Sequence, residues 1–282
     1  MKIAISAEST IDLTPELVEK CDIKIVQFTI NLGEEAFFDK DISPQDIFEY
    51  VEKNKLLPKT SAVNQFQFEQ HFENILKEYD AIIHFSLSSE MSSACENAKT
   101  ASAKFKNVFV IDTRSLSTGI ALLVLSACDM KKDGMMAKEI VEKIKRRIDF
   151  VQASFVLDRL DYLYKGGRCN ALMYFGANLL KLHPQIIVKD GKMISGHKYR
   201  GSLEKVTLNY VKDTLAEFNN PDKKRAFITF TTATETLIFQ IEKILKEKGF
   251  QEIYKTTAGA TISSHCGENT LGILYINDGG GV

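Results

Sequence analysis

The sequence predicts an α/β fold with two α/β domains: an N-terminal domain with a mostly parallel sheet flanked by helices, and a C-terminal domain with a mixed sheet and helices. Short apolar runs alternate with helical patterns through the first half, which is typical of parallel βαβ units. In the second half, Asp190-Gly191 lies between two alternating runs and predicts a β-hairpin. The chain has 282 residues, 44% of them hydrophobic and 26% charged, which suffices for two modest globular domains.

The elements of the N-terminal domain, expected over residues 1–149, follow from periodicity and from helix-start signals. Thr14-Pro15 and Ser43-Pro44 each place an N-cap residue before a proline, so a helix is expected to begin at each point. The remaining elements follow from apolar runs and faces. We expect strands over residues 2–6, 23–32, 81–87 and 108–112, and further helices over residues 64–76, 92–105, 115–130 and 136–148.

The C-terminal domain, expected over residues 150–282, mixes the hairpin with strand–helix units. Residues 258–272 surround one histidine with small polar residues and glycines, and the pattern indicates a strand, a short polar loop and another strand. The glycine-rich tail 278–281 is expected to be flexible. We expect strands over residues 151–156, 184–189, 192–199, 225–231, 252–257 and 271–276, and helices over residues 159–164, 170–180, 202–218 and 234–248.

The charge balance argues against a nucleic-acid-binding protein, because 36 basic and 37 acidic residues leave a net charge of −1. The basic run 143–147 is interpreted as a solvated helix face. No transmembrane segment is expected, since the longest apolar stretch, 119–128, is too short to span a bilayer. We expect a cytoplasmic protein, because no signal peptide is visible and the five cysteines form no CxxC pair.

Four polar clusters follow expected strands or helices: Thr60-Ser61, Ser92-Ser93, residues 166–168, and Ser264-His265. Each cluster taken alone is more often a turn or a helix cap. In open α/β folds, however, ligands bind where such loops gather, beyond the carboxyl ends of strands. The first two clusters lie in one expected domain and the other two in the second, so we expect a ligand site between the domains.

The sequence lacks the motifs that usually mark acyl hydrolysis, nucleotide phosphate binding and metal binding. The Gly-x-Ser-x-Gly elbow of α/β-hydrolases and the Gly-x-x-x-x-Gly-Lys-Ser/Thr phosphate loop are both absent. The five histidines form no HxH or HxxxH pair, so neither a metal nor a cofactor is expected. Cys266 is discounted as a nucleophile beside His265, because adjacent residues of a strand point to opposite faces. An acyl-ester hydrolase that uses Ser92 and His265 stays open.

Recognition of a small anionic head group needs fewer special features. The hydroxyls of Thr60 and Ser92 can donate hydrogen bonds to a carboxylate, and His265 and Arg168 can supply further donors. The 18 phenylalanines could line an apolar slot, although core packing accounts for most of them.

The order of the motifs adds a resemblance. Lys59-Thr60-Ser61, Ser88-Ser-Glu-Met-Ser92, the run Leu160 to Arg168 that ends in Lys-Gly-Gly-Arg, and His265-x-Gly267 occur in the order found in the DegV family. The chain resembles these fatty-acid-binding proteins, which serve bacterial fatty acid kinase, over essentially its whole length. The resemblance implies a fatty acid buried between two α/β domains and a separate kinase that phosphorylates it. The chain would then be a lipid-binding subunit and not the enzyme.

The resemblance also implies the residues of the site. Thr60 and Ser92 would hold the carboxylate, with His265 and Arg168 close by. The chain departs from the family at Glu8, at Ser93-Ala94, at Ala62-Val63 and after His265, and these departures bear on acyl-chain selectivity and on the match to a kinase. A regulatory interaction protein with a structural lipid is a further alternative. The full set expected at the carboxylate is Thr60, Ser61, Ser92, Ser93, Arg168 and His265.

Overall fold

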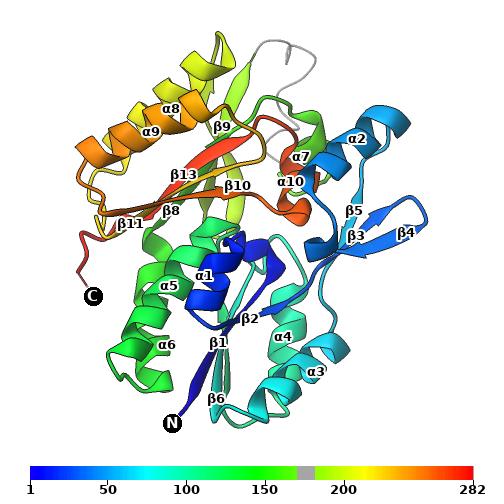
Figure 1. Cartoon of the computed structure of the whole chain (residues 1–282), viewed down its shortest axis with the longest axis vertical. Helices are drawn as coiled ribbons and strands as arrows, with labels where there is room; N and C mark the ends of the chain where they lie inside the picture. Colours follow the sequence, from blue (N-terminus) through cyan, green and yellow to red (C-terminus); the bar gives the residue numbers. More distant parts are fainter. Residues whose placement is uncertain (170–181, 282) are drawn as a thin grey trace.

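The computed structural model describes residues 1–169 and 182–281, whose strands form three sheets (Figure 1). A four-stranded sheet belongs to the N-terminal half and a six-stranded sheet to the C-terminal half. A small three-stranded sheet stands beside them. Helices flank both larger sheets, and the predicted two-domain α/β fold is confirmed. The helix expected over residues 170–180 lies outside the described residues.

The N-terminal sheet has the strand order β2-β1-β6-β7, and all neighbouring strands run parallel, as predicted. Strands β1 and β6 are buried along their whole length, because helices cover both faces of the sheet (Figure 1). The strands are β1 (Ile3–Glu8), β2 (Ile23–Val26), β6 (Ala81–Ser86) and β7 (Val108–Asp112), and the helices are α1 (Pro15–Lys20), α3 (Gln65–Leu76), α4 (Ala94–Ser102), α5 (Thr118–Lys132) and α6 (Ala137–Arg147).

The C-terminal sheet has the order β10-β9-β8-β13-β11-β12 and is mixed, since β11 and β12 run parallel and the other neighbours antiparallel. The predicted hairpin is confirmed: Asp190 and Gly191 join β9 to β10 with φ of 52° and 78°, as a type I′ turn requires. The strands are β8 (Val151–Val156), β9 (His183–Lys189), β10 (Lys192–Tyr199), β11 (Arg225–Phe230), β12 (Glu252–Thr257) and β13 (Leu271–Ile276), and α8 (Leu203–Glu217) and α9 (Glu235–Glu247) cover the outer face.

Helix α5 joins the two halves. It packs against β1 and β6 of the first sheet and against β8, β11 and β13 of the second. Every residue from Thr118 to Cys128 is buried, which explains why this helix is apolar on all sides. The apolar stretch 119–128 is therefore the centre of a core shared by both sheets.

The expectation of a single strand over residues 23–32 is wrong. The chain turns away at Phe28, whose N–H donates to Ser9 Oγ at 3.1 Å, and the second part enters the small antiparallel sheet. Side-chain alternation continues through this break, so the pattern indicated a strand but not its partner. The small sheet has the order β4-β3-β5, with β3 (Thr29–Leu32), β4 (Glu35–Phe38) and β5 (Lys59–Ser61), and α2 (Pro44–Asn54) lies beside it.

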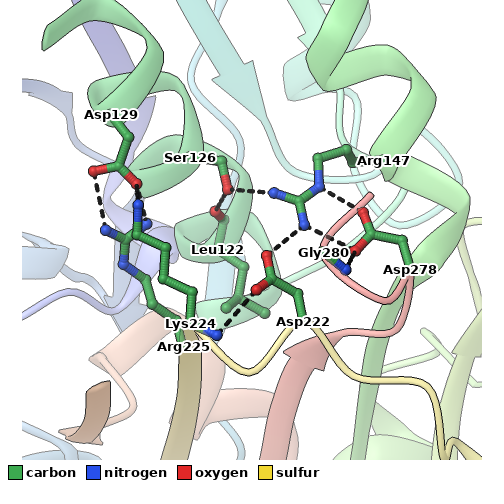
Figure 2. A network of polar contacts seen from close by, with 9 residues as sticks. All are labelled: Leu122, Ser126, Asp129, Arg147, Asp222, Lys224, Arg225, Asp278 and Gly280. Atoms are coloured by element: carbon green, nitrogen blue, oxygen red, sulfur yellow. Dashed lines mark hydrogen bonds and ion pairs between the residues drawn. The ribbon is translucent and has the colours of Figure 1, made fainter. Parts of the chain in front are cut away.

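The interpretation of the basic run 143–147 as a solvated helix face is wrong for Arg147, although Lys145 and Arg146 are exposed. Arg147 is only 7% exposed, because it continues the buried stripe of α6 formed by Ile140 and Ile144. Its Nε atom donates to Asp278 Oδ2 at 2.7 Å (Figure 2). The N–H of Gly279 donates to the carbonyl oxygen of Asn220 at 2.8 Å. The tail is thus held against the end of α6, and Arg147 does not belong to a solvated face.

Candidate functional site

A cavity of about 250 Å³ lies between the two halves of the chain. The N-terminal half contributes β5 and the loop between β6 and α4. The C-terminal half contributes β10, the segment around α7 (Asp161–Lys165), and helix α10 (Ala260–Cys266). The lining residues are Phe28, Thr60, Ala62, Leu87, Met91, Ser92, Ser93, Leu116, Leu163, Arg168, Met193, Thr261, Ile262, His265 and Cys266.

The cavity brings together five of the six residues expected at a carboxylate site, namely Thr60, Ser92, Ser93, Arg168 and His265. Ser61 is the exception. It follows Thr60 on β5, and successive strand residues point to opposite faces. Its Oγ atom accepts a hydrogen bond from Asn31 at 3.2 Å on the exposed side of the small sheet, so Ser61 does not line the cavity.

His265 lies in the last turn of helix α10, so the expected strand–loop–strand pattern over residues 258–272 is wrong. The two strands are present as β12 and β13, but a seven-residue helix replaces the loop. The hydroxyls of Ser263 and Ser264 donate to the helix-start carbonyls of Ala258 and Ala260, at 3.0 and 2.7 Å. So short a helix completes too few turns for apolar periodicity to reveal it.

The imidazole of His265 is neutral and joins the two halves. Its Nε2 atom lies 2.8 Å from Thr60 Oγ1. Burial, reinforced by the nearby Arg168 guanidinium, lowers the pKa of His265 to about 4. Its Nδ1 atom is buried and finds no hydrogen-bond partner in residues 1–169 and 182–281. A buried acceptor without a partner is less rare than a buried N–H without one, which favours a proton on Nε2. Thr60 then accepts from His265 and keeps its own proton to donate.

Two further donors face the same space. Ser92 Oγ accepts from the N–H of Ala94 at 3.2 Å, which leaves the Ser92 hydroxyl proton free to donate. Arg168 is exposed at the cavity, and its Nη1 atom donates to the carbonyl oxygen of Gly166 at 2.7 Å. The hydroxyls of Thr60 and Ser92 with the rest of the Arg168 guanidinium can therefore donate to an anion with two oxygens.

The other serines of the β6–α4 loop hold the loop in place and do not line the cavity. Ser88 Oγ donates to the carbonyl oxygen of Gly191 at 2.7 Å, which ties the loop to the β9–β10 hairpin. Ser89 Oγ donates to Asp112 Oδ2 at 2.5 Å. These bonds fix the entry to α4, where Ser92 and Ser93 are placed.

Two buried aspartates missed in the sequence hold helix α10. Asp12 Oδ1 accepts from the N–H of Gly259 at 2.8 Å, and Asp39 Oδ1 accepts from the N–H of Thr261 at 3.0 Å. Both acids are buried and come from the N-terminal half. They satisfy N–H groups that a helix start leaves without partners within the helix. No local signal could have paired them with α10, because 247 residues separate Asp12 from Gly259.

Apart from Thr261, the remaining residues that line the cavity are apolar. A smaller cavity of about 30 Å³ shares Leu116, Ile262 and Cys266 with the first and is also lined by Phe155 and Leu274. The two cavities are therefore adjacent, and together they mark an apolar path from the polar groups toward the C-terminal sheet.

Cys266 lines this path beside His265, so the argument that a strand separates the two side chains does not hold. The thiol is unreactive for another reason. Burial raises the pKa of Cys266 to about 12, so the nucleophilic thiolate is not formed near neutral pH.

Within the part of the chain that the structure describes, no group of three or more His, Cys, Asp or Glu residues is arranged to hold a metal ion. None of the described helices is both long enough and apolar enough to cross a membrane.

Comparison with known proteins places the chain in a family. Residues 2–278 match the model of the DegV family, described as "Uncharacterised protein, DegV family". A DegV domain-containing protein of Clostridium acetobutylicum is 30% identical over 280 residues, which cover 98% of both chains. The structure of a DegV family protein from Thermus thermophilus, described by its fatty acid binding, is similar with a TM-score of 0.90 and 25% identity, over 98% of this chain and 100% of the other.

The fold also matches that of the Fatty Acid Kinase (Fak) B3 protein from Streptococcus pneumoniae, whose structure is loaded with linoleic acid. The TM-score is 0.85 at 21% identity, over 99% of this chain and 100% of the other. This chain therefore belongs to the DegV family.

Proposed function

We propose that this chain binds a long-chain fatty acid in the cavity between a domain of residues 1–149 and a domain of residues 150–282. The carboxylate accepts hydrogen bonds from Thr60 and Ser92, near Arg168, Ser93 and the neutral His265. The acyl chain follows the apolar walls. One observation carries this proposal: the cavity that holds the donors Thr60, Ser92 and Arg168 adjoins a second, smaller cavity that is lined mainly by apolar residues.

The energetics suit an amphipathic ligand. Burial of each methylene group contributes about 0.8 kcal/mol, so a long acyl chain contributes on the order of 10 kcal/mol before the costs of binding. The head group then needs only satisfied hydrogen bonds, because an unpaired buried carboxylate would cost much of this gain. The hydroxyls of Thr60 and Ser92 meet that need without a fully buried counter-charge.

We further propose that the chain is a carrier and not a catalyst, and that it presents the carboxylate to a separate fatty acid kinase in the cytoplasm. The Lys-Gly-Gly-Arg motif that ends at Arg168 and the other motifs shared with the DegV family support this role. A Ser–His hydrolase is less well supported. Its histidine needs an acid partner, and the Nδ1 atom of His265 has none among the described residues.

The first test is direct. The purified protein is denatured and the released small molecules are identified by mass spectrometry; a fatty acid near one per chain is expected. Thr60→Val and Ser92→Ala should then each weaken acyl binding by about 1–3 kcal/mol, the cost of an acceptor left unpaired. Ser61→Ala is the matched control. Ser61 lies next to Thr60 but on the opposite face of β5, so this variant should bind the fatty acid as tightly as the wild type.

The possible outcomes distinguish a fatty acid carrier from a hydrolase and from a regulatory protein. Unchanged binding in both Thr60→Val and Ser92→Ala would remove the head-group assignment. Steady turnover of a chromogenic ester that Ser92→Ala abolishes would instead establish a hydrolase. For the kinase role, a bacterial fatty acid kinase with ATP should form acyl phosphate only when the loaded chain is added. A lipid that neither exchanges nor becomes phosphorylated would favour a regulatory protein.

A further inference from the structure

Thr261 presents a further polar group to the cavity, in addition to the five residues expected there from the sequence. It lies four residues before His265 on helix α10, so both side chains occupy the same face of the helix. Thr261 is only 3% exposed and lines the cavity. Its Oγ1 atom is buried and has no hydrogen-bond partner in the described ranges of the chain.

The position of Thr261 in the helix explains its free hydroxyl. Ser and Thr hydroxyls inside helices usually donate to a carbonyl about one turn back. Ser264 does so on α10, through a 2.7 Å hydrogen bond to the carbonyl oxygen of Ala260. Thr261 is the second residue of α10, so the residue four positions back, Thr257, belongs to β12 and not to the helix. The Thr261 hydroxyl therefore has no helix carbonyl oxygen to donate to, and it lies at the cavity wall.

A buried hydroxyl without a partner costs free energy, and most such groups in folded proteins have one. The protein groups nearest in sequence do not supply it here. The backbone N–H of Thr261 donates to Asp39, and the side chain of Ile262 beside it offers only apolar atoms. Because none of the described residues supplies a partner, we look for it in the occupant of the cavity.

The helix geometry locates this point on a bound fatty acid. A rise of about 1.5 Å per residue puts Thr261 roughly 6 Å along the helix from His265. With the carboxylate at Thr60 and His265, the Thr261 hydroxyl faces the ligand a few bonds beyond the carboxyl carbon. The smaller cavity beyond Ile262 and Cys266 is lined mainly by apolar residues, so a polar substituent there would lose hydrogen bonds.

We propose that Thr261 hydrogen-bonds an oxygen substituent on the first few carbons of the acyl chain, and that the preferred ligand is a long-chain hydroxy fatty acid. This inference rests on the proposed function. A site with a buried hydrogen-bonding group discriminates well against an analogue that lacks the matching group, because the buried group is then left unpaired.

The test compares dissociation constants of delipidated protein for hexadecanoate and 3-hydroxyhexadecanoate. The wild-type protein should bind the hydroxylated acid at least about fivefold more tightly, the ratio that a net hydrogen bond of about 1 kcal/mol gives. Thr261→Val has nearly the same shape without the hydroxyl, and it should lose this preference while hexadecanoate binds as well or better. Ser264→Ala is the control and should keep the preference, because the Ser264 hydroxyl already bonds to Ala260.

A second ligand pair tests position. With 12-hydroxyoctadecanoate and octadecanoate, the hydroxyl should bring no gain, since it would lie against the apolar part of the path. Equal affinity of wild-type protein for hexadecanoate and its 3-hydroxy derivative would overturn the role of Thr261 and leave fatty acid binding intact. So would a crystal structure with hexadecanoate in which one water bridges Thr261 Oγ1 and His265 Nδ1. Failure to bind any of these acids would remove the proposed function itself.

Discussion

The hydroxyl oxygen of Thr60 on β5 lies 2.8 Å from Nε2 of His265 on α10, so one hydrogen bond joins positions 205 residues apart. It connects the small antiparallel sheet of the N-terminal half to a helix of the C-terminal half, at the polar end of the cavity. Because the imidazole is neutral and Nε2 is engaged, Thr60 is oriented to donate toward the cavity. The charge state of His265 therefore matters for both stability and binding.

Acidification should destabilise the wild-type protein more than His265→Gln. Burial lowers the pKa of His265 from 6.5 to about 4, so between these pH values the unfolded chain binds a proton that the folded chain excludes. The contribution of the neutral His265 to the free energy of unfolding is fully present above pH 6.5 and decreases as the pH drops toward 4. Urea unfolding at about pH 7.5 and about pH 5 should show the wild type losing up to about 2 kcal/mol more than the variant.

The comparison with His265→Gln isolates this effect. The pKa of His71 is also lowered, to about 3, by burial and by the neighbouring His84, but both proteins contain His71 and its contribution cancels. Equal losses in the two proteins would contradict a buried neutral imidazole at position 265.

Gly166→Ala should weaken fatty acid binding at least tenfold. A Cβ atom at Gly166 would lie 2.7 Å from Nδ1 of His265 and 2.9 Å from the carbonyl oxygen of Tyr162, so the imidazole must move. Gly167→Ala is the control. Gly167 has a φ of 70°, and no atom of the described residues lies within 4 Å of the added Cβ, so alanine there strains the backbone by about 1–2 kcal/mol without touching His265.

Calorimetric titration and thermal unfolding distinguish the two glycines. Gly166→Ala should lose affinity, and Gly167→Ala should lose melting temperature while it keeps affinity. Normal affinity in Gly166→Ala would mean that His265 can shift without harm to the site.

The sequence predicted those parts of the fold that local signals determine. The Asp190-Gly191 turn specified its hairpin because both residues adopt positive φ readily. Strands β7, β12 and β13 match their predicted ranges, since alternating or apolar runs and flanking polar residues mark both ends. Strand β5 has only three residues and pairs with a strand nearly thirty positions earlier, so its pattern carried too little information.

The candidate site was predicted from motifs, and only in part. Thr60 and His265 were identified as polar residues after expected elements, and the structure places them in contact. Thr261 was missed because the helix that contains it was predicted as a loop, where a threonine carries no signal of a binding role. Asp12 and Asp39 were missed because their partners on α10 lie more than two hundred positions away. Long-range pairing of this kind leaves no trace in a single sequence.

Asp12→Asn should stabilise the protein more at alkaline pH than at acid pH. Burial raises the pKa of Asp12 from 3.8 to about 8. Hydrogen bonds from Ser117 and Gly259 lower this pKa in part, and repulsion from Asp39 raises it further. Between these values the folded chain holds a proton that the unfolded chain releases, so stability falls as the pH rises. The permanently neutral asparagine avoids this loss, and its oxygen can still accept from Gly259.

Chemical denaturation at about pH 5.5 and about pH 8.5 checks this prediction. The stability of Asp12→Asn relative to the wild type should increase between these conditions by on the order of 3 kcal/mol. Asp41→Asn removes the same charge from an exposed position nearby and should show no such increase. A constant difference for Asp12→Asn would contradict a proton on the buried carboxyl group.

Arg147→Met should destabilise the protein strongly. The Arg147 guanidinium pairs with Asp278 at 2.7 Å and with Asp222 at 2.6 Å, and the side chain of Asp278 is only 4% exposed (Figure 2). Loss of the cation leaves a buried carboxylate without its counter-charge, which costs about 3–5 kcal/mol in comparable pairs. Arg146→Met is the matched control, because Arg146 is the exposed neighbour on the same helix and should change stability little.

A double variant separates the unpaired charge from lost packing. If the uncompensated Asp278 carboxylate causes the loss, Arg147→Met with Asp278→Asn should be more stable than Arg147→Met alone, because the buried site then carries less unpaired charge. Urea denaturation of the wild type, both single arginine variants and the double variant gives the required order. An Arg147→Met protein as stable as Arg146→Met would show that the ion pairs of Arg147 contribute nothing to the stability of the fold. A double variant no better than Arg147→Met would assign the loss to the packing of the Arg147 side chain against α5, where its Nη1 donates to Ser126 Oγ at 3.3 Å.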